Sequence, residues 1–136
     1  MRFGGRWNSP GLAVIYGATT SAGAMLEVLV HTRIGKVPKT HVCVEAFVPT
    51  GVLIETIGLK MLAKGWDNQE STTAREFGDR WIREERTAVL LAPSVVTGEV
   101  ENVLINPAHR DAHKIRVSKP RPVIWDNRLF ISPRKK

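Results

Sequence analysis

A glycine-rich run close to the N-terminus has the composition of a phosphate-binding loop. In Gly4-Gly5-Arg6-Trp7-Asn8, the glycines would let backbone amides approach a phosphate, and the arginine could donate hydrogen bonds to its oxygens. The run is neither a P-loop nor a dinucleotide-binding fingerprint, because no Gly-Lys-Ser/Thr follows it and no predicted strand precedes it. An ordinary turn that carries a surface arginine is the alternative interpretation.

Glu27 is a second candidate because of the surface that a helix would build around it. At about 100° per residue, a helix over 20–32 places Gly23, Ala24, Glu27 and His31 on one face. The turn that precedes Glu27 on this face holds only small side chains, on which a ligand could rest. The alternative is an exposed i, i+4 pair of Glu27 with His31, worth roughly 0.2–0.5 kcal/mol.

Tyr16 and Ser94 both lie at the ends of predicted strands. Tyr16 is the only tyrosine of the chain, and its amphipathic ring could stack on a flat heterocycle at the mouth of a cleft. Ser94 follows Pro93 and offers a hydroxyl group. Half-buried tyrosines are common at strand ends, and such hydroxyls often satisfy turn backbone instead.

The histidines and the cysteine form no motif for a metal or for a nucleophilic catalyst. His109 and His113 are four residues apart and would share a helical face, but only Asp111 supplies a neighbouring carboxylate. Cys43 lies within an apolar predicted strand and is expected in the core. A single cysteine excludes an intramolecular disulfide and favours a reducing cytoplasm.

These residues require a scaffold of short strands and helices. The length of 136 residues suits one domain, and the irregular alternation of strand-like and helix-like stretches indicates an α+β fold. Strands are expected over 13–16, 40–48, 52–56, 88–92, 103–105 and 123–125. The turn-rich segment 4–11 precedes the first of them, and Asn106-Pro107 forms a turn.

Two helices are expected. The first, over 20–32, should bury an apolar stripe made of Ala22, Met25, Leu26 and Leu29. The second begins at Thr72 or Thr73 as its cap and runs to about residue 84, with Phe77 and Trp81 on the core side. The segment 58–71 between them reads as a loop with one helical turn over 59–63.

The charge of the chain is unevenly distributed. The net charge is +7, but residues 1–108 carry 11 basic and 11 acidic side chains, so the whole excess lies in 109–136. Such a segment attracts nucleic acid, an acidic protein or a phosphorylated small molecule. The last four residues, 133–136, are expected to form a frayed basic end. The apolar runs are shorter than the roughly 20 residues of a membrane span, and the N-terminus lacks the apolar region of a signal peptide.

Taken together, these residues resemble the RES-domain family. The family takes its name from an arginine, a glutamate and a serine, which would be Arg6, Glu27 and Ser94 here. Family members usually carry a further stretch with a first strand before the glycine-rich motif, whereas this chain starts almost on the motif. The resemblance rests on Gly4-Gly5-Arg6-Trp7-Asn8, Gly11, Tyr16, Ala24, Glu27-Val28-Leu29, Pro93-Ser94-Val95-Val96 and Asn102-Val103-Leu104-Ile105-Asn106-Pro107-Ala108-His109.

The resemblance implies a fold and an activity. The fold would be one compact domain over 1–136, similar to diphtheria-toxin-like ADP-ribosyltransferases, with a mostly antiparallel split sheet flanked by helices. The activity would be that of a cytoplasmic toxin from a bacterial toxin–antitoxin pair that cleaves the nicotinamide–ribose bond of NAD by hydrolysis or, with inorganic phosphate as co-substrate, by phosphorolysis. Transfer of ADP-ribose to a protein is the alternative. An Xre-type antitoxin would block the active-site entrance, and a homodimer is compatible with the family.

The resemblance also implies residue roles. A carboxylate beneath the ribose stabilises the oxocarbenium charge that develops as the bond breaks, and Glu27 would supply it. Arg6 would hold the pyrophosphate or ribose, Tyr16 would stack on nicotinamide, and Ser94 would orient ribose or a phosphate. Nicotinamide leaves as a neutral molecule, so no strong general acid is needed at that end, and no metal is expected. The NAD-binding loop would comprise Gly4, Gly5, Trp7 and Asn8.

A nucleic-acid module is the rival hypothesis. It would be a ribonuclease toxin with His109 and His113 as base and acid, or a binder that uses the basic C-terminal segment. The few, scattered aromatic residues lack the basic interleaving that stacks bases. Docking of an acidic antitoxin is a further explanation of the basic segment.

Overall fold

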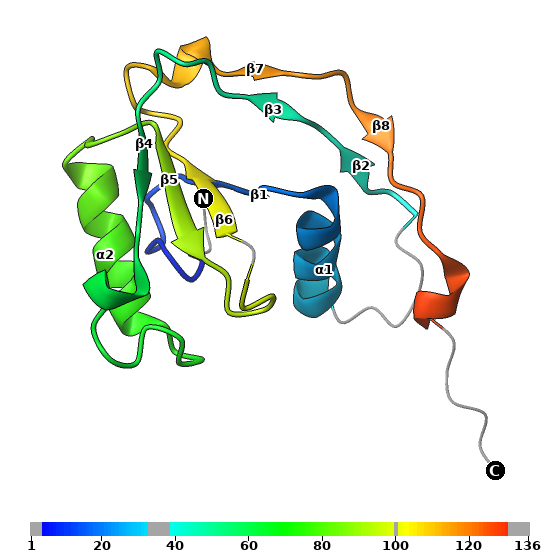
Figure 1. Cartoon of the computed structure of the whole chain (residues 1–136), viewed down its shortest axis with the longest axis horizontal. Coiled ribbons are helices and arrows are strands. Elements are labelled where there is room, and N and C mark those ends of the chain that lie inside the picture. The colour runs from blue at the N-terminus through cyan, green and yellow to red at the C-terminus, as the bar shows by residue number, and fades with distance from the viewer. Residues whose placement is uncertain (1–3, 33–38, 100, 131–136) are drawn as a thin grey trace.

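The centre of the molecule is a four-stranded mixed sheet (Figure 1). The computed structural model describes residues 4–32, 39–99 and 101–130, and the predicted basic end at 133–136 lies outside them. The strand order is β1-β6-β5-β4, in which only β4 and β5 are parallel. The strands are β1 (Ile15–Ala18), β4 (Ile54–Thr56), β5 (Val89–Pro93) and β6 (Glu101–Ile105).

The direction of the strands brings the C-terminal ends of β1 and β5 to the same edge of the sheet. Both β1 and β5 are antiparallel to β6, and Ala18 and Ala92 are both paired with Asn102. The two strands therefore run in the same direction, and the segments that follow them leave the sheet at the same edge. The expected α+β fold is confirmed, although the first strand begins at Ile15, two residues later than predicted.

Helix α2 (Thr72–Arg83) covers the sheet and completes the main core (Figure 1). Trp81 of this helix is fully buried, as predicted, and the partly buried Phe77 packs against the core cluster. The predicted cap is wrong, because the helix is preceded by Ser71 in a left-handed conformation (φ 50°) without a side-chain capping bond. The core cluster consists of Trp7, Val14, Ile57, Ala74, Trp81, Ile82, Leu90, Ala92 and Leu104.

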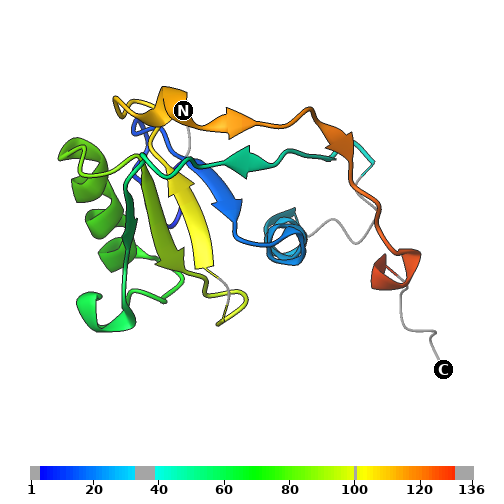
Figure 2. The same cartoon turned by 45° about the horizontal axis from the view of Figure 1, so that its top comes forward.

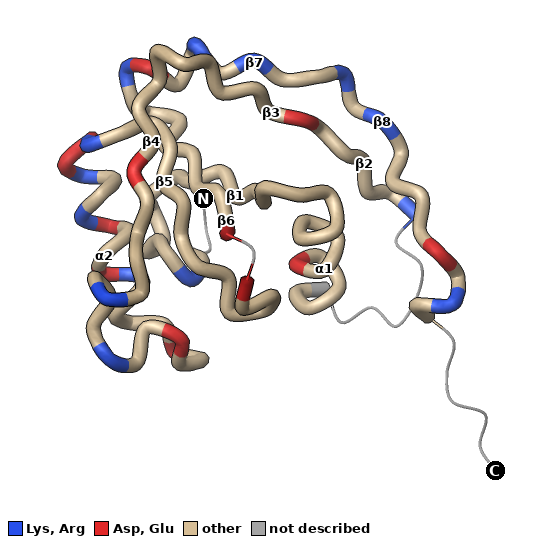
Figure 3. Tube along the Cα trace, viewed as in Figure 1, with Lys and Arg blue, Asp and Glu red and all other residues tan. Residues whose placement is uncertain are grey.

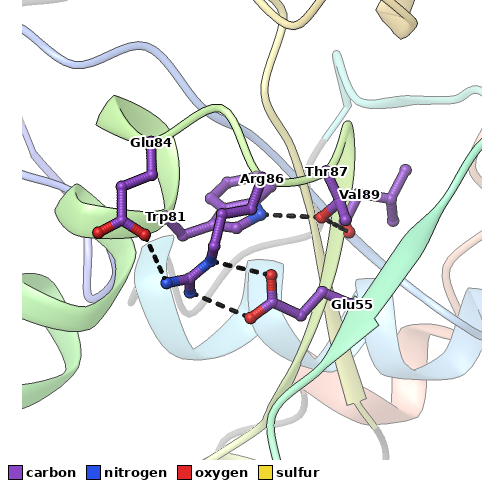
Figure 4. A network of polar contacts seen from close by, with 6 residues as sticks. All are labelled: Glu55, Trp81, Glu84, Arg86, Thr87 and Val89. Atoms are coloured by element: carbon purple, nitrogen blue, oxygen red, sulfur yellow. Dashed lines mark hydrogen bonds and ion pairs between the residues drawn. The ribbon is translucent and has the colours of Figure 1, made fainter.

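Polar contacts join the end of α2 to the sheet (Figure 4). The Trp81 indole donates to Thr87 Oγ1 at 3.0 Å. Arg86 donates two hydrogen bonds to Glu55 of β4, at 3.0 and 3.2 Å, and a third to Glu84 at 2.9 Å. The bidentate geometry fixes the α2–β5 connection against β4. Between β4 and α2, the predicted helical turn is present as the 3-10 helix η1 (Leu59–Met61).

Helix α1 (Ser21–Thr32) lies beyond the end of β1 (Figures 1 and 2). Its bounds agree with the prediction, but the predicted apolar stripe is not fully buried, since Met25 and Leu29 are only partly buried. Ala22 and Leu26 are exposed, whereas Gly23 on the other face is buried and Glu27 is partly buried. Among the described residues, the helix lies beside the sheet rather than between two layers, so its apolar stripe is not fully covered (Figures 1 and 2).

The segment predicted as one strand over 40–48 forms two shorter strands in an extended arm (Figure 2). Val42–Cys43 (β2) pairs with Arg121–Pro122 (β8), and Ala46–Phe47 (β3) pairs with Arg116–Val117 (β7), both antiparallel. The predicted strand over 123–125 is therefore wrong, since the ladder lies just before it. Cys43 is partly exposed on this arm rather than in the core. Two further 3-10 helices are η2 (Ala112–Lys114) and η3 (Asn127–Phe130).

Within the described ranges, no helix combines the length and the apolar character that crossing a membrane requires.

Candidate active site

The glycine-rich loop is held together from inside by Asn8. This side chain is 1% exposed, and its Oδ1 accepts hydrogen bonds from the Gly5 N–H at 3.0 Å and from the Tyr16 hydroxyl at 2.5 Å. Its Nδ2 donates to the Leu12 carbonyl oxygen at 2.7 Å. One buried carboxamide thus fixes both sides of the loop and the strand that follows it.

The glycines of the loop are required by its internal packing. A Cβ at Gly4 would overlap the Asn8 carbonyl oxygen, and a Cβ at Gly5 would lie 2.5 Å from the Tyr16 hydroxyl oxygen. Close approach of backbone to backbone and of backbone to side chain therefore explains both glycines. The sequence pattern indicated close approach at these positions but attributed it to a phosphate.

Helix α2 anchors the loop through two residues that the sequence reasoning missed. Asp79 is 8% exposed and accepts bonds from the Ser9 N–H at 2.7 Å and the Ser9 hydroxyl at 2.5 Å. A Cβ at Gly78 would overlap the Trp7 carbonyl group, so this glycine lets the helix approach the loop backbone. The sequence feature that could have indicated these two residues is a Gly-Asp pair in the middle of an amphipathic helix.

Arg6 lies against a second loop. Its Nη1 donates to the carbonyl oxygens of Trp66 at 3.3 Å and Asn68 at 2.9 Å. Beside it, the fully buried Trp7 ring stacks on Trp66, with 6.2 Å between centroids and 30° between planes. A guanidinium has five N–H donors, and these two contacts use only one of its nitrogens. Arg6 is thus held in place by backbone while it remains a cation.

Tyr16 connects this loop to the sheet. Its hydroxyl donates to Asn8 and accepts a bond from the Trp7 N–H at 3.2 Å. The residue is nevertheless 41% exposed. The hydroxyl end of the ring is therefore part of the loop framework, while part of the ring surface is open to solvent.

The surroundings of Tyr16 raise its pKa above the ordinary value of 10.0. Burial of the hydroxyl is the largest cause, because it disfavours the phenolate. The bond from the Trp7 N–H and the positive charges of Arg75 and Arg6 lower the pKa, and the negative charge of Asp79 raises it. The neutral hydroxyl is thus the form that this loop stabilises.

Glu27 and Ser94 meet at the sheet edge where β1 and β5 end. The Ser94 hydroxyl donates to Glu27 Oε1 at 2.8 Å, and Ser94 Oγ accepts a bond from the Thr97 N–H at 3.2 Å. Ser94 is 4% exposed, and the Glu27 side chain is 21% exposed. The strand directions explain this meeting, because α1 follows β1 and Ser94 follows β5.

His31 contacts Glu27 from the next turn of α1. Its Nδ1 lies 2.8 Å from the Glu27 carbonyl oxygen and 3.6 Å from the Glu27 carboxylate Oε2. The predicted i, i+4 pair is therefore present. The Glu27 carboxylate has the Ser94 hydroxyl on one oxygen and an imidazole near the other.

The two other histidines considered from the sequence lie in different surroundings. His109 is buried and its Nδ1 accepts a bond from the Asp111 N–H at 3.0 Å, whereas His113 is exposed and bonds to the Arg110 carbonyl oxygen at 2.7 Å. They do not share an α-helical face, because the chain here forms turns and η2. Residues 4–32, 39–99 and 101–130 contain no cluster of three or more potential metal ligands of the His, Cys, Asp or Glu type.

Comparisons with known proteins match nearly the whole chain. The family model described as the RES domain matches residues 1–126. A protein named Prs ADP-ribosylating toxin, from Sphingobium, is 42% identical over 130 residues, which cover 93% of this chain and 81% of the relative. A protein named Toxin Res from Pseudomonas putida is 37% identical over 134 residues, covering 96% and 88%. A Toxin Res from Yersinia enterocolitica is 30% identical over 134 residues, covering 93% and 84%.

Proposed function

Because this chain belongs to the RES domain toxin family, we propose that it is a toxin that cleaves the nicotinamide–ribose bond of NAD and transfers ADP-ribose to a protein. The observation that carries the proposal is the hydrogen bond between Ser94 and Glu27 at the sheet edge. The name of the Sphingobium relative supports transfer to a protein over degradation of NAD.

Glu27 would act on the charge that develops during bond cleavage. As the bond to nicotinamide lengthens, the ribose becomes an oxocarbenium ion, and an oriented carboxylate stabilises this state more than the ground state. The bond from Ser94 holds one carboxylate oxygen, so that the negative charge need not reorient when the cation forms. Nicotinamide leaves with the bonding electron pair as a neutral molecule.

Arg6 and Tyr16 would bind the two ends of the substrate. The guanidinium of Arg6, held by the carbonyl groups of Trp66 and Asn68, has further N–H donors for the pyrophosphate or a ribose hydroxyl. The exposed part of the Tyr16 ring would stack on nicotinamide. A planar heterocycle and a diphosphate are the two chemical groups of NAD that these side chains fit.

The remaining residues of the motif would act indirectly. Trp7 and Asn8 are at most 1% exposed, so we assign them to the shape of the loop rather than to direct contact with NAD. Gly4 and Gly5 permit that shape. The Ser94 hydroxyl hydrogen is directed at Glu27, and this serine would orient the ribose by fixing the carboxylate beneath it.

Hydrolysis or phosphorolysis of NAD is the second candidate function. Both share the first bond cleavage with protein modification and differ only in the acceptor. The Glu27 side chain is 21% exposed, so water or inorganic phosphate could replace a protein nucleophile at this edge. NAD would be a substrate in each case, and no step requires a metal.

The experiment that separates these functions follows the fate of ADP-ribose. Purified protein is incubated with NAD labelled in the adenosine part, in plain buffer, with phosphate, and with Prs, the protein named as the target of the Sphingobium relative. Label on Prs supports the proposed transfer. Free ADP-ribose, or its phosphorylated form in phosphate buffer, supports the second candidate. Unchanged NAD in all three incubations contradicts both.

An Xre-type antitoxin is the partner that we propose for this toxin. Basic residues lie along β7 and β8 of the arm (Figure 3). By sequence they include Arg116, Lys119 and Arg121, and an acidic protein surface would complement them. A homodimer and a nucleic acid are the competing partners. Binding to nucleic acid would weaken steeply with added salt, whereas an antitoxin complex should also suppress NAD cleavage.

A further inference from the structure

The contact between His31 and Glu27 determines which ring nitrogen of the histidine carries the proton. A carbonyl oxygen can only accept a hydrogen bond, so the 2.8 Å contact with the Glu27 carbonyl oxygen requires a proton on His31 Nδ1. In the neutral imidazole, the proton is on one nitrogen and the lone pair is on the other. Neutral His31 therefore has its lone pair on Nε2.

The position of this lone pair suits contact with an incoming molecule. The His31 side chain is 73% exposed, and Nε2 lies across the ring from the nitrogen that bonds to the helix. The same ring nitrogen Nδ1 is 3.6 Å from a carboxylate oxygen of Glu27. An oriented imidazole with an accessible lone pair thus lies one helical turn from the carboxylate to which we assign the chemistry.

We propose that His31 is the general base for the acceptor in the proposed ADP-ribosyl transfer, and this inference rests on the proposed function. As C1′ of the ribose loses nicotinamide, a lone pair of the acceptor oxygen or nitrogen forms the new bond to C1′. The acceptor proton moves to His31 Nε2, which gives an imidazolium ion that later releases the proton to water. The Glu27 carboxylate near Nδ1 stabilises this imidazolium.

A histidine in the last turn of a helix can also have a purely structural role, because its side chain can satisfy a carbonyl group there. The two roles use different atoms. Helix capping needs only the Nδ1–H donor, whereas proton transfer needs Nε2. Asparagine places its Nδ2–H close to the position of histidine Nδ1 and has no group at the position of Nε2. The substitution His31→Asn therefore removes the proposed base and keeps a hydrogen-bond donor for the Glu27 carbonyl oxygen.

The test is a competition between two acceptors for the same ADP-ribosyl group. NAD is cleaved in a mixture of methanol, which must lose a proton to form a stable product, and azide, which has no proton to lose. The ratio of the methyl to the azido adduct depends on acceptor activation and not on the amount of folded enzyme. His113→Asn is the matched control, since His113 makes the same type of Nδ1 contact with a carbonyl oxygen, 2.7 Å from Arg110 O.

With the wild-type protein and the His113→Asn control, we expect equal ratios of methyl to azido adduct. For His31→Asn we expect this ratio to fall by about 100-fold, and imidazole added to the buffer should partly restore it. If the ratio of methyl to azido adduct is unchanged in His31→Asn, the assignment of His31 as the general base is wrong, whatever happens to the total rate of NAD cleavage. If the wild-type protein releases no nicotinamide with methanol, azide or Prs as the acceptor, the proposed function itself fails and the assignment of His31 fails with it.

Discussion

Ser94 donates its hydroxyl hydrogen to the carboxylate of Glu27 at 2.8 Å, across 67 positions of the sequence. The contact joins the end of β5 to the middle of α1, two elements that leave the sheet at one edge because β1 and β5 run in the same direction. The serine is buried and the carboxylate partly exposed. One oxygen of the carboxylate is thereby fixed, His31 lies near the other, and the side chain remains partly exposed.

Ser94→Ala should impair activity more than stability. The variant loses one hydrogen bond, which contributes about 0.5–1.5 kcal/mol to folding, but it releases the carboxylate that must face the developing cation. We expect nicotinamide release to fall by roughly 10- to 100-fold, and thermal unfolding to show only a small loss of stability. Ser118→Ala, at an exposed serine of the arm, is the control. Equal nicotinamide release by Ser94→Ala and wild type would show that Glu27 needs no support from Ser94.

Asp79→Ala should loosen the glycine-rich loop. Its carboxylate accepts the backbone N–H and the hydroxyl of Ser9, and an unsatisfied buried donor costs about 1–3 kcal/mol. We expect a loss of this size in denaturant unfolding and a weaker apparent affinity for NAD, since Arg6 is part of the same loop. Glu76→Ala, at an exposed acidic residue of the same helix, should match the wild type. If Asp79→Ala unfolds at the same denaturant concentration as the wild type, Asp79 does not anchor the loop.

Gly5→Ala should disturb the contact between the loop and Tyr16. The new methyl group would lie 2.5 Å from the Tyr16 hydroxyl oxygen, and such overpacking typically costs about 1–3 kcal/mol. We expect lower thermal stability and reduced NAD cleavage. Gly51→Ala is the matched control, because nothing lies within 4 Å of a Cβ at that position. If both variants unfold like the wild type, the tight fit at Gly5 is refuted.

Tyr16 should titrate above the tyrosine of the unfolded chain. Its pKa is raised chiefly by burial, so the folded state prefers the neutral hydroxyl. The stabilisation is fully present below the unfolded pKa of about 10 and is lost as the pH rises through the higher folded pKa. Since the chain has one tyrosine, tyrosinate absorbance reports this group alone. If the titration midpoint of Tyr16 in the folded protein is at or below that in the denatured protein, the described environment of Tyr16 is contradicted. The variant Tyr16→Phe gives the background absorbance.

The sequence predicted the positions of most elements but not the direction in which α1 faces. The spacing of the apolar residues predicted the helix bounds correctly, and the i, i+4 spacing predicted the pair of Glu27 with His31. It placed Leu26 in the core because an apolar stripe normally faces a second layer. In the structure, the helix instead turns Gly23 inward. Which face is buried depends on neighbours that follow from strand direction, and periodicity within one helix contains no such information.

The candidate site was predictable only as a set of residues. The motif and the resemblance selected Arg6, Glu27 and Ser94, and the structure brings Glu27 and Ser94 together while Arg6 contacts the 66–68 loop. Asp79 was missed because its role depends on a contact 70 positions away in the sequence. The splitting of the strand over 40–48 likewise depends on pairing with the distant segment 116–122.

The most direct test of the central claim is the rate of nicotinamide release from NAD by Glu27→Gln, with and without Prs. Gln has nearly the same shape as Glu and can still accept the Ser94 bond, but it lacks the negative charge. We expect the rate to fall about 100- to 1000-fold with unchanged thermal unfolding, while the exposed control Glu76→Gln cleaves NAD at the wild-type rate. Wild-type nicotinamide release by Glu27→Gln would contradict the assignment of this carboxylate and of the site built around it.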